Sequence, residues 1–563
     1  MSTTDNKFLT DIEIAQNNEM EHIKEIAAKL NIAEDDFEMY GKYKAKLPIR
    51  LIDEKKVAKS NLILVTALTP TPAGEGKTTI SIGLTDGLNK IGKNAIVVIR
   101  EPSLGPVFGI KGGAAGGGYS QVVPMEDINL HFTGDFSAIE KANNLLSALI
   151  DNNIQSRTRS LHIDPRTIAW KRVMDMNDRA LREITIGLGG TANGIPRQDG
   201  FNITPASEVM AILCMAKDFA DLKERLGNIY VGQTFDRNPV YAQDLKAENA
   251  MAILLKDAIN PNLVQTLERN PAIIHGGPFA NIAQGTNSIL ATKMGLTMSE
   301  YVITEAGFGA DLGAEKFLNI KCVSAGLKPK AVVLVATIRA LRHHGGAPTE
   351  EYNDINVERV QKGFSNLEKH IENMKKFGLN PVVAINAFPT DGEEEVKLIQ
   401  ERCAAMNVQA VVANGFTRGG EGMTKLAGEV VKEIEAGNNN FEPLYDWEAP
   451  VKEKIAIIAK EIYGAEGVEY SKKALNNLKR IEALGLDKLP ICMAKTQKSF
   501  SDDATLLARP EGFMVNVREF EFAAGAGFLI PILGNMMRMP GLPAIPASEG
   551  MYIDNTGKIS GLS

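Results

Sequence analysis

The chain alternates short, continuously apolar runs with longer segments whose apolar residues recur at helical spacing. The apolar runs have the length of strands that are buried on both faces of a sheet. They cover residues 61–69, 94–101, 331–340, 381–388 and 410–414. Helical patterns lie between them, as in residues 77–92 and 356–378. This alternation predicts an α/β fold built on a doubly wound, mostly parallel sheet, which binds ligands beyond the carboxyl ends of its strands.

We predict two smaller domains beside this core. Residues 1–135 and 290–365 would form the core, residues 136–289 a second α/β domain, and residues 366–563 a C-terminal domain. Within the second domain, residues 205–227 have the pattern of one amphipathic helix.

Composition narrows the class of protein. The 563 residues are 44% apolar and 23% charged, which is typical of a globular protein with two to four domains. A net charge of −7 gives no electrostatic reason to expect a nucleic-acid or membrane partner. The four scattered cysteines argue against a disulfide framework or a zinc site, and the longest apolar runs are far too short to span a membrane. We therefore expect a cytoplasmic protein.

The stretch TPAGEGKTT, residues 71–79, resembles a phosphate-binding P-loop between a predicted strand and a predicted helix. Lys77 would contact the β- and γ-phosphates and Thr78 would ligate Mg²⁺, while the start of the helix favours an anion. Thr71 replaces the usual first glycine, as in P-loop ligases of the dethiobiotin-synthetase branch, which phosphorylate a carboxylate. The alternative is an ordinary glycine-rich turn. The predicted nucleotide-binding residues are Thr71, Pro72, Ala73, Gly74, Glu75, Gly76, Lys77 and Thr78.

A second candidate anion site follows the strand at residues 94–101. Arg100 would lie at the carboxyl edge of the sheet, where a guanidinium binds a carboxylate or phosphate through two hydrogen bonds. The glycine-rich stretch GIKGGAAGGGY follows at residues 109–119. The alternative is a surface ion pair between Arg100 and Glu101, followed by a flexible linker.

Two long stretches identify a family by resemblance. GIKGGAAGGGY (residues 109–119) and VATIRALRHHGG (335–346) resemble the two signature stretches of formate–tetrahydrofolate ligase. The resemblance continues through residues 40–47, 122–135 and 305–317, and then through NAFPTD at 386–391. It implies an enzyme of one-carbon metabolism that joins formate to tetrahydrofolate with ATP. The products would be 10-formyltetrahydrofolate, ADP and phosphate, formed through formyl phosphate.

The resemblance also implies roles for individual residues. Lys77 would hold the transferring phosphate of Mg-ATP, with Thr78 on the metal. Arg100 would bind formate and then formyl phosphate, and the backbone N–H groups of Gly307 and Gly309 would cradle that intermediate. A monovalent cation, potassium or ammonium, and a homotetramer are further family expectations, and the ligands of the cation stay open.

The folate would bind through residues of the C-terminal domain. The resemblance places Phe388, Pro389 and Phe416 at the pterin, with the two rings stacking on it. Phe416 stands where the family often has tryptophan, so stacking is kept while contact area and an N–H donor are lost. Without the resemblance, each phenylalanine is more often a core residue.

Other interpretations stay open at this point. An ATP-driven switch of the partitioning-ATPase type would also use a P-loop, but it needs neither Arg100 nor the paired aromatic residues. His131 and His275 could assist proton removal from the attacking amine, although a structural role is more common. Asp127 and Asp135 could serve a cation or folate, or could cap a loop.

Overall fold

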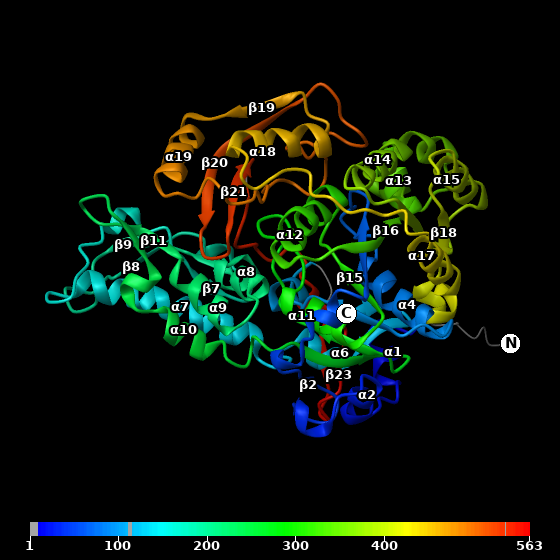
Figure 1. The fold of residues 1–563 in the computed structure, drawn as a ribbon, viewed down its shortest axis with the longest axis horizontal. Helices are drawn as coiled ribbons and strands as arrows, with labels where there is room; N and C mark the ends of the chain where they lie inside the picture. Colours follow the sequence, from blue (N-terminus) through cyan, green and yellow to red (C-terminus); the bar gives the residue numbers. More distant parts are fainter. Residues whose placement is uncertain (1–8, 111–114, 535, 563) are drawn as a thin grey trace.

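The structure, a computed structural model, describes residues 9–110, 115–534 and 536–562, and a large sheet runs through its middle (Figure 1). Within these residues, twelve strands form this sheet, with a continuous block of parallel strands. In spatial order the parallel strands are β14 (Pro271–Ile274), β4 (Ala95–Ile99), β15 (Tyr301–Glu305), β3 (Asn61–Ala67), β16 (Pro329–Ala336), β17 (Pro381–Asn386) and β18 (Ala410–Ala413). Antiparallel strands extend the β14 edge: β13 (Asn262–Thr266), β2 (Ala45–Lys46), β1 (Glu38–Met39), β6 (Ser120–Val123) and β5 (Gly116–Gly117).

Helices cover both faces of the parallel block, which confirms the doubly wound architecture. Side chains of β3 alternate between two cores: Leu62 and Leu64 belong to one, Ile63 and Val65 to the other. The core around Leu64 includes residues of α11 (Ile289–Met298), α13 (Ile338–His344) and α14 (Val357–Lys376). The core around Val65 includes residues of α4 (Lys77–Lys90) and α17 (Thr424–Ala436). All five apolar runs therefore contain strands; helices bury four of them on both sides, while three of the four residues of the edge strand β18 are only half-buried.

A second region, cyan to green in Figure 1, lies beside the sheet and has its own core. It contains α7 (Asp135–Gln155), α10 (Glu248–Leu254) and several two-stranded ladders. The predicted single helix at residues 205–227 is instead two helices, α8 (Glu208–Met215) and α9 (Phe219–Gly227). The Asp218 side chain accepts the Asp221 N–H and so starts a new helix.

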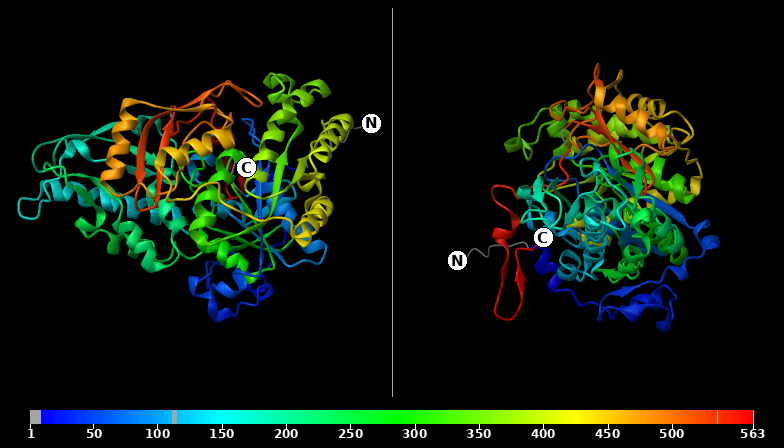
Figure 2. Two further views of the ribbon diagram at one scale, coloured as in Figure 1. Left: turned by 45° about the horizontal axis from the view of Figure 1, so that its top comes forward. Right: turned by 90° about the vertical axis from the view of Figure 1, so that its left-hand side faces the viewer.

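The C-terminal part forms a three-stranded sheet of β19 (Gly467–Tyr470), β20 (Met514–Ala523) and β21 (Phe528–Leu533). Helices α18 (Val451–Ile457) and α19 (Lys472–Ala483) accompany it. Ile530 belongs to the core of the second region and Leu529 to the core of the central sheet. β21 therefore packs between the two. The hairpin of β22 (Tyr552–Ile553) and β23 (Ile559–Ser560) projects from the body (Figure 2).

The central sheet crosses all three predicted domain boundaries. β13 and β14 come from the predicted second domain, and β17 and β18 from the predicted C-terminal domain, yet all four pair within the central sheet. An apolar run signals a buried strand but not the sheet it joins, so the sequence pattern could not assign these strands. The division at residues 289 and 366 stays a prediction.

In the part of the chain that the structure describes, no helix is long and apolar enough to cross a membrane. The four cysteines are buried free thiols. No cluster of three or more histidine, cysteine or acidic side chains is arranged there to hold a metal ion.

Two glycines on one face of α4 allow residues 419–423 to pack directly on it. A Cβ on Gly83 would lie 2.7 Å from the Ser120 hydroxyl oxygen, and one on Gly87 would lie 2.9 Å from the Met423 Cβ. The same Cβ would lie 3.0 Å from the Met423 carbonyl carbon and 3.1 Å from its oxygen. This contact holds the helix that follows the candidate phosphate loop.

Gly87→Val should lower the free energy of unfolding by about 1–3 kcal/mol, because the added methyl groups overpack against the Met423 backbone. Thermal unfolding should therefore show a lower Tm than wild type. Gly428→Ala in α17 is the matched control, since a Cβ there meets no atom within 4 Å. It should leave the Tm unchanged or raise it. An unchanged Tm for Gly87→Val would contradict the close packing.

Candidate active site

Polar residues from several strands gather at the carboxyl edge of the parallel block. β3 leads into residues 68–76, β4 into Arg100, and β16 into Thr337, while β15 ends at Glu305 and β17 at Asn386. β15 lies between β3 and β4, and its Glu305 pairs in register with Val65. Parallel pairing therefore brings these loops to the place where α/β sheets bind ligands.

The loop after β3 has the geometry that an anion needs. Gly74 and Gly76 have φ values of 76° and 73°, which glycine adopts at little cost. Gly76 precedes the first residue of α4, Lys77, and provides no side-chain cap for the N–H groups of the first turn. Pro72 and Ala73 are exposed and form the outer rim of the loop. Uncapped N–H groups at a helix start stabilise bound phosphate.

Glu75 turns inward and braces this loop. Its carboxylate accepts hydrogen bonds from the Thr71 N–H (2.6 Å) and the Thr71 hydroxyl (2.9 Å), and from the Thr337 hydroxyl. Burial raises the pKa of Glu75, while these hydrogen bonds act in the opposite direction. The sequence predicted that both residues contact nucleotide. Here the two side chains bond to each other, and Glu75 also bonds to Thr337 at the start of α13, so they shape the loop.

Glu305 connects the loop to Arg100, and the sequence prediction had missed it. The Thr78 hydroxyl donates to its Oε2 at 2.8 Å, and the Arg100 guanidinium lies 3.8 Å from its Oε1. Arg100 also donates to the Pro278 carbonyl at 3.2 Å, and its buried Nε has no hydrogen-bond partner within the described residues. The available signal was an acidic residue directly after an apolar run. Thr78 and Arg100, which are far apart in the sequence, thus share one buried carboxylate.

Of the two predicted cradle glycines, Gly307 is already engaged, whereas the role of Gly309 stays a prediction. The Gly307 N–H donates to the Gly285 carbonyl at 3.0 Å, so it is already engaged. A Cβ on Gly307 would lie 2.7 Å from the Ala280 Cβ and 3.0 Å from a terminal nitrogen of Arg100, and one on Gly309 would lie 2.6 Å from an Asp311 oxygen. Phe308 between them has a φ of 59°, which is uncommon for a bulky residue and typical of functional sites. Gly307 makes room for the guanidinium, a role that spacing alone did not indicate.

Phe388 and Pro389 lie just beyond β17, next to the loop. The Phe388 N–H donates to Asp391 at 2.8 Å, which fixes the turn, and Pro389 is exposed. The Arg339 guanidinium lies 5.2 Å from the centre of the Phe388 ring. Arg339 was another residue that the sequence prediction did not single out, although it belongs to the stretch VATIRALRHHGG.

Phe416 follows the neighbouring strand. Asn386 pairs in register with Ala413, so Phe388 and Phe416 leave adjacent strand ends. The Phe416 side chain is 46% exposed, and its carbonyl accepts the Tyr119 N–H at 2.9 Å. A Cβ on Gly118 would lie 2.1 Å from that carbonyl oxygen, so this part of the glycine-rich stretch seats Phe416. Residues 111–114 of that stretch lie outside the described residues.

Three residues whose roles the sequence left open, Asp127, Asp135 and His275, bind other groups of the protein. Asp135 forms a buried ion pair with Lys46 at 2.7 Å, and Asp127 pairs with Lys44 at 2.6 Å. His275 is buried between the Ser288 hydroxyl and the Ala258 carbonyl, each at 2.6 Å. Burial lowers its pKa to about 4, so it is neutral at physiological pH. None of these contacts reaches Arg100 or the loop.

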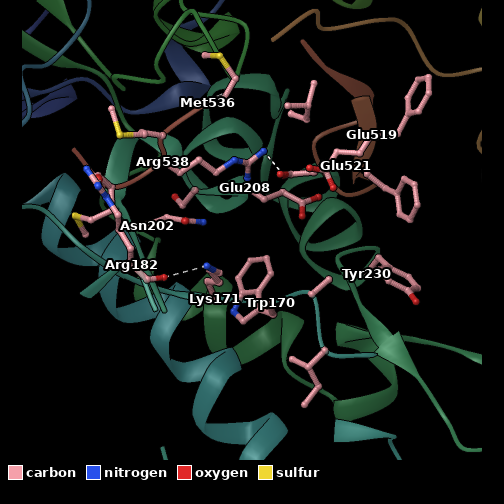
Figure 3. A pocket seen from close by; sticks show the side chains of 18 of the residues that line it. Trp170, Lys171, Arg182, Asn202, Glu208, Tyr230, Glu519, Glu521, Met536 and Arg538 are labelled. Atoms are coloured by element: carbon pink, nitrogen blue, oxygen red, sulfur yellow. Dashed lines mark hydrogen bonds and ion pairs between the residues drawn. The ribbon is translucent and has the colours of Figure 1, made fainter. Parts of the chain in front are cut away.

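A cavity of about 740 Å³ lies elsewhere, between the second region and β20–β21 (Figure 3). None of the predicted site residues lines it. Its charged groups pair with protein groups: Arg538 with Glu521, and Lys171 with the Arg182 carbonyl at 3.2 Å. The carboxylate of Glu208 accepts the Gly525 N–H at 2.8 Å and so joins the two parts of the chain. The sheet edge, not this cavity, is the candidate active site.

The fold defines an α/β protein with polar loops beyond the carboxyl edge of a mostly parallel sheet. The chain belongs to the formate–tetrahydrofolate ligase family, whose sequence model matches residues 9–563. It is therefore an ATP-dependent ligase of one-carbon metabolism that joins formate to tetrahydrofolate and gives 10-formyltetrahydrofolate. ATP and a folate are accordingly among its substrates, and the switch interpretation falls away.

Solved structures resemble the chain only distantly. Helicobacter pylori folylpolyglutamate synthetase matches at 10% identity over 85% of this chain and 91% of its own, with a TM-score of 0.21. A mutant of L. casei FPGS matches at 10% identity over 72% of this chain and 81% of its own, with a TM-score of 0.16. Values this low support no argument about this chain.

Gly307→Ala should lower kcat/KM for formate by up to about 100-fold, because its Cβ would clash with the Ala280 Cβ and crowd the Arg100 guanidinium, so that the backbone or the guanidinium must shift. The measurement is the initial rate at varied formate with ATP and tetrahydrofolate saturating. Gly428→Ala again serves as the control, and the Tm of both variants shows that the fold is retained. A wild-type kcat/KM in a folded Gly307→Ala protein would contradict the importance of this close approach.

Proposed function

We propose that the ligation runs through formyl phosphate at the sheet edge formed by residues 71–78, Arg100 and Glu305. The observation that carries this proposal is the shared Glu305 carboxylate, which lies between the Thr78 hydroxyl and the Arg100 guanidinium. A phosphate held at the start of α4 and a carboxylate held by Arg100 would then be neighbours. Two anions must meet in the first step, so their neutralisation is the main task of the site.

The chemistry has two steps. A formate oxygen attacks the γ-phosphorus of ATP, a P–O bond forms to formate, and the P–O bond to ADP breaks. The folate nitrogen then attacks the formyl carbon, the C–O bond to phosphate breaks, and the nitrogen loses its proton. Lys77 would contact the transferring phosphoryl group, and Arg100 would hold formate and the negative charge that develops on formyl phosphate. Little covalent work is left to the protein, so positioning dominates.

The donor set beside the loop suits Mg²⁺. The Thr78 hydroxyl and the Glu305 carboxylate supply oxygen ligands, directly or through water, which this hard cation prefers. Bound with ATP, the ion would neutralise phosphate charge during transfer. Thr78 and Glu305 would hold it, while Arg100 remains for formate.

Folate would bind beyond β17 and β18, with Phe388, Pro389 and Phe416 around the pterin. Support comes from the adjacent strand ends and from the exposure of Phe416. Phe416 keeps the stacking that tryptophan often supplies in this family, with less contact area and no N–H. Gly309 remains a candidate backbone contact for the intermediate. We also keep as proposals the activating monovalent cation, the homotetramer and the cytoplasmic location.

Arg100→Ser should lower kcat/KM by about 10²–10³-fold, the scale for loss of one group that stabilises developing negative charge. The measurement is the rate of 10-formyltetrahydrofolate formation at varied formate. Arg157→Ser, an exposed arginine in the second region, is the matched control and should keep the wild-type rate. An unchanged kcat/KM in Arg100→Ser would remove Arg100 from the mechanism.

Glu305→Gln should raise the apparent KM for Mg²⁺ by about 10–100-fold, since an amide keeps the shape of the side chain but loses its negative charge. Initial rates at fixed ATP and varied Mg²⁺ test this. Glu300→Gln, just before β15 and exposed, is the control. If the Mg²⁺ dependence of Glu305→Gln matches wild type, Glu305 does not serve the metal.

A further inference from the structure

Arg339 touches both halves of the site at once. It lies in the first turn of α13, and one terminal nitrogen donates to the Gly74 carbonyl at 2.9 Å. The same guanidinium lies 5.2 Å from the centre of the Phe388 ring, a cation–π distance. Gly74 belongs to the loop after β3, and Phe388 follows β17. One side chain therefore connects the nucleotide loop with the first folate aromatic residue.

Hydrogen bonds of neighbouring residues fix the position of Arg339 relative to the loop. Thr337, the N-cap of α13, accepts the Ala340 N–H at 3.1 Å and donates its hydroxyl proton to Glu75 of the loop. A second link runs beside it, because the Asn386 side-chain amide donates to the Glu75 carbonyl at 3.1 Å. The loop is thus attached to α13 and β17 by hydrogen bonds from Arg339, Thr337 and Asn386.

These bonds set the direction of the N–H groups in the loop. The Gly74 carbonyl and the Glu75 N–H belong to one planar trans peptide unit, in which the two groups point in opposite directions. The Glu75 carbonyl and the Gly76 N–H form the next unit. Arg339 binds the Gly74 carbonyl and Asn386 binds the Glu75 carbonyl. The N–H groups of Glu75 and Gly76 therefore point away from these two side chains and are oriented before an anion arrives.

Arg339 also has an unused donor. Its Nε is buried and has no hydrogen-bond partner within the part of the chain that the structure describes. A buried donor without a partner is unfavourable, so a ligand or a small shift of the side chain that satisfies it would stabilise the site. Arg339 also acts on two carboxyl groups, Glu75 in the loop and Asp391 beside Phe388. Burial raises the pKa of both groups, and the positive charge of Arg339 acts in the opposite direction.

We propose that Arg339 is a positioning residue that couples nucleotide binding in the loop to folate binding on Phe388. This inference rests on the proposed function, since it takes the loop as the phosphate site and Phe388 as part of the pterin site. A phosphate that accepts the Glu75 N–H polarises the peptide and makes the Gly74 carbonyl a stronger acceptor. Arg339 is then held more firmly over one face of Phe388, which leaves the ring oriented with its other face for the pterin.

The sign of the coupling follows from this geometry. Nucleotide should tighten folate binding, and folate should tighten nucleotide binding by the same factor, because coupling free energies are reciprocal. We expect a factor of about 5 or more, at the lower end of the usual range for such coupling. Substitution of a residue that only supports the fold would change the tetrahydrofolate affinity by the same factor with and without nucleotide. The ratio of the two Kd values would then stay the same.

The test measures the Kd of tetrahydrofolate by calorimetry, with no nucleotide and with saturating Mg-ADP, in the absence of formate. Wild type should bind tetrahydrofolate about 5-fold or more tightly when ADP is present. Arg339→Met keeps the length of the side chain and removes its donors, so the two Kd values should become equal. Arg402→Met, on the exposed side of α15 (Glu393–Ala405), is the matched control and should keep the wild-type ratio.

A wild-type ratio near 1, or an unchanged ratio in Arg339→Met, would overturn the proposal. Arg339→Lys keeps the charge but loses the planar group, and it replaces Arg339→Met if that variant does not fold, with the same expected loss. Two other variants test the proposed function separately: Lys77→Ala should weaken ADP binding, and Phe388→Ala should weaken tetrahydrofolate binding. If either affinity is unchanged, that site assignment fails, whereas the ratio in Arg339→Met decides the role of Arg339.

Discussion

Parallel strands must all end at one edge of their sheet, and the whole site depends on this constraint. β15 returns to the sheet about 200 residues after β4 and inserts between β4 and β3. Its last residue, Glu305, consequently lies between the loop that follows β3 and the arginine that follows β4. The insertion separates β3 from β4, so Glu305 is the residue that links Thr78, which follows β3, to Arg100, which follows β4.

Burial of carboxylates then fixes the geometry of the edge. A buried charge is costly unless it is paired or hydrogen-bonded, so each buried carboxylate must gather donors around it. Glu75 accepts hydrogen bonds from Thr71 and Thr337. Glu305 accepts a hydrogen bond from Thr78 and pairs with Arg100. The result is a set of polar groups that are oriented before substrate binds, as electrostatic catalysis requires. Glycine permits close contacts at this edge, such as that of Gly307 with Ala280 and Arg100.

The sequence predicted the main strands, the helix after the loop, and the placement of Arg100 at the sheet edge. It did not indicate Glu305 or Arg339, because an acidic residue after a strand and an arginine in a helix are both common surface features. Gly307 was expected to donate its N–H to the intermediate, but that N–H bonds to Gly285. The pattern of residues 205–227 could not reveal the break at Asp218, where a local side-chain hydrogen bond outweighs continued periodicity.

Local periodicity and motif order determined the fold class, the loop and the family, since these depend on neighbours in the sequence. Which strands pair was decided only by the tertiary structure, and with it the contacts among Thr78, Glu305, Arg100, Arg339 and Phe388. The physical reason is that apolar runs are interchangeable as buried strands, whereas strand order follows from how all helices and strands together bury their apolar faces. That order sets the positions of the side chains that we propose for the chemistry.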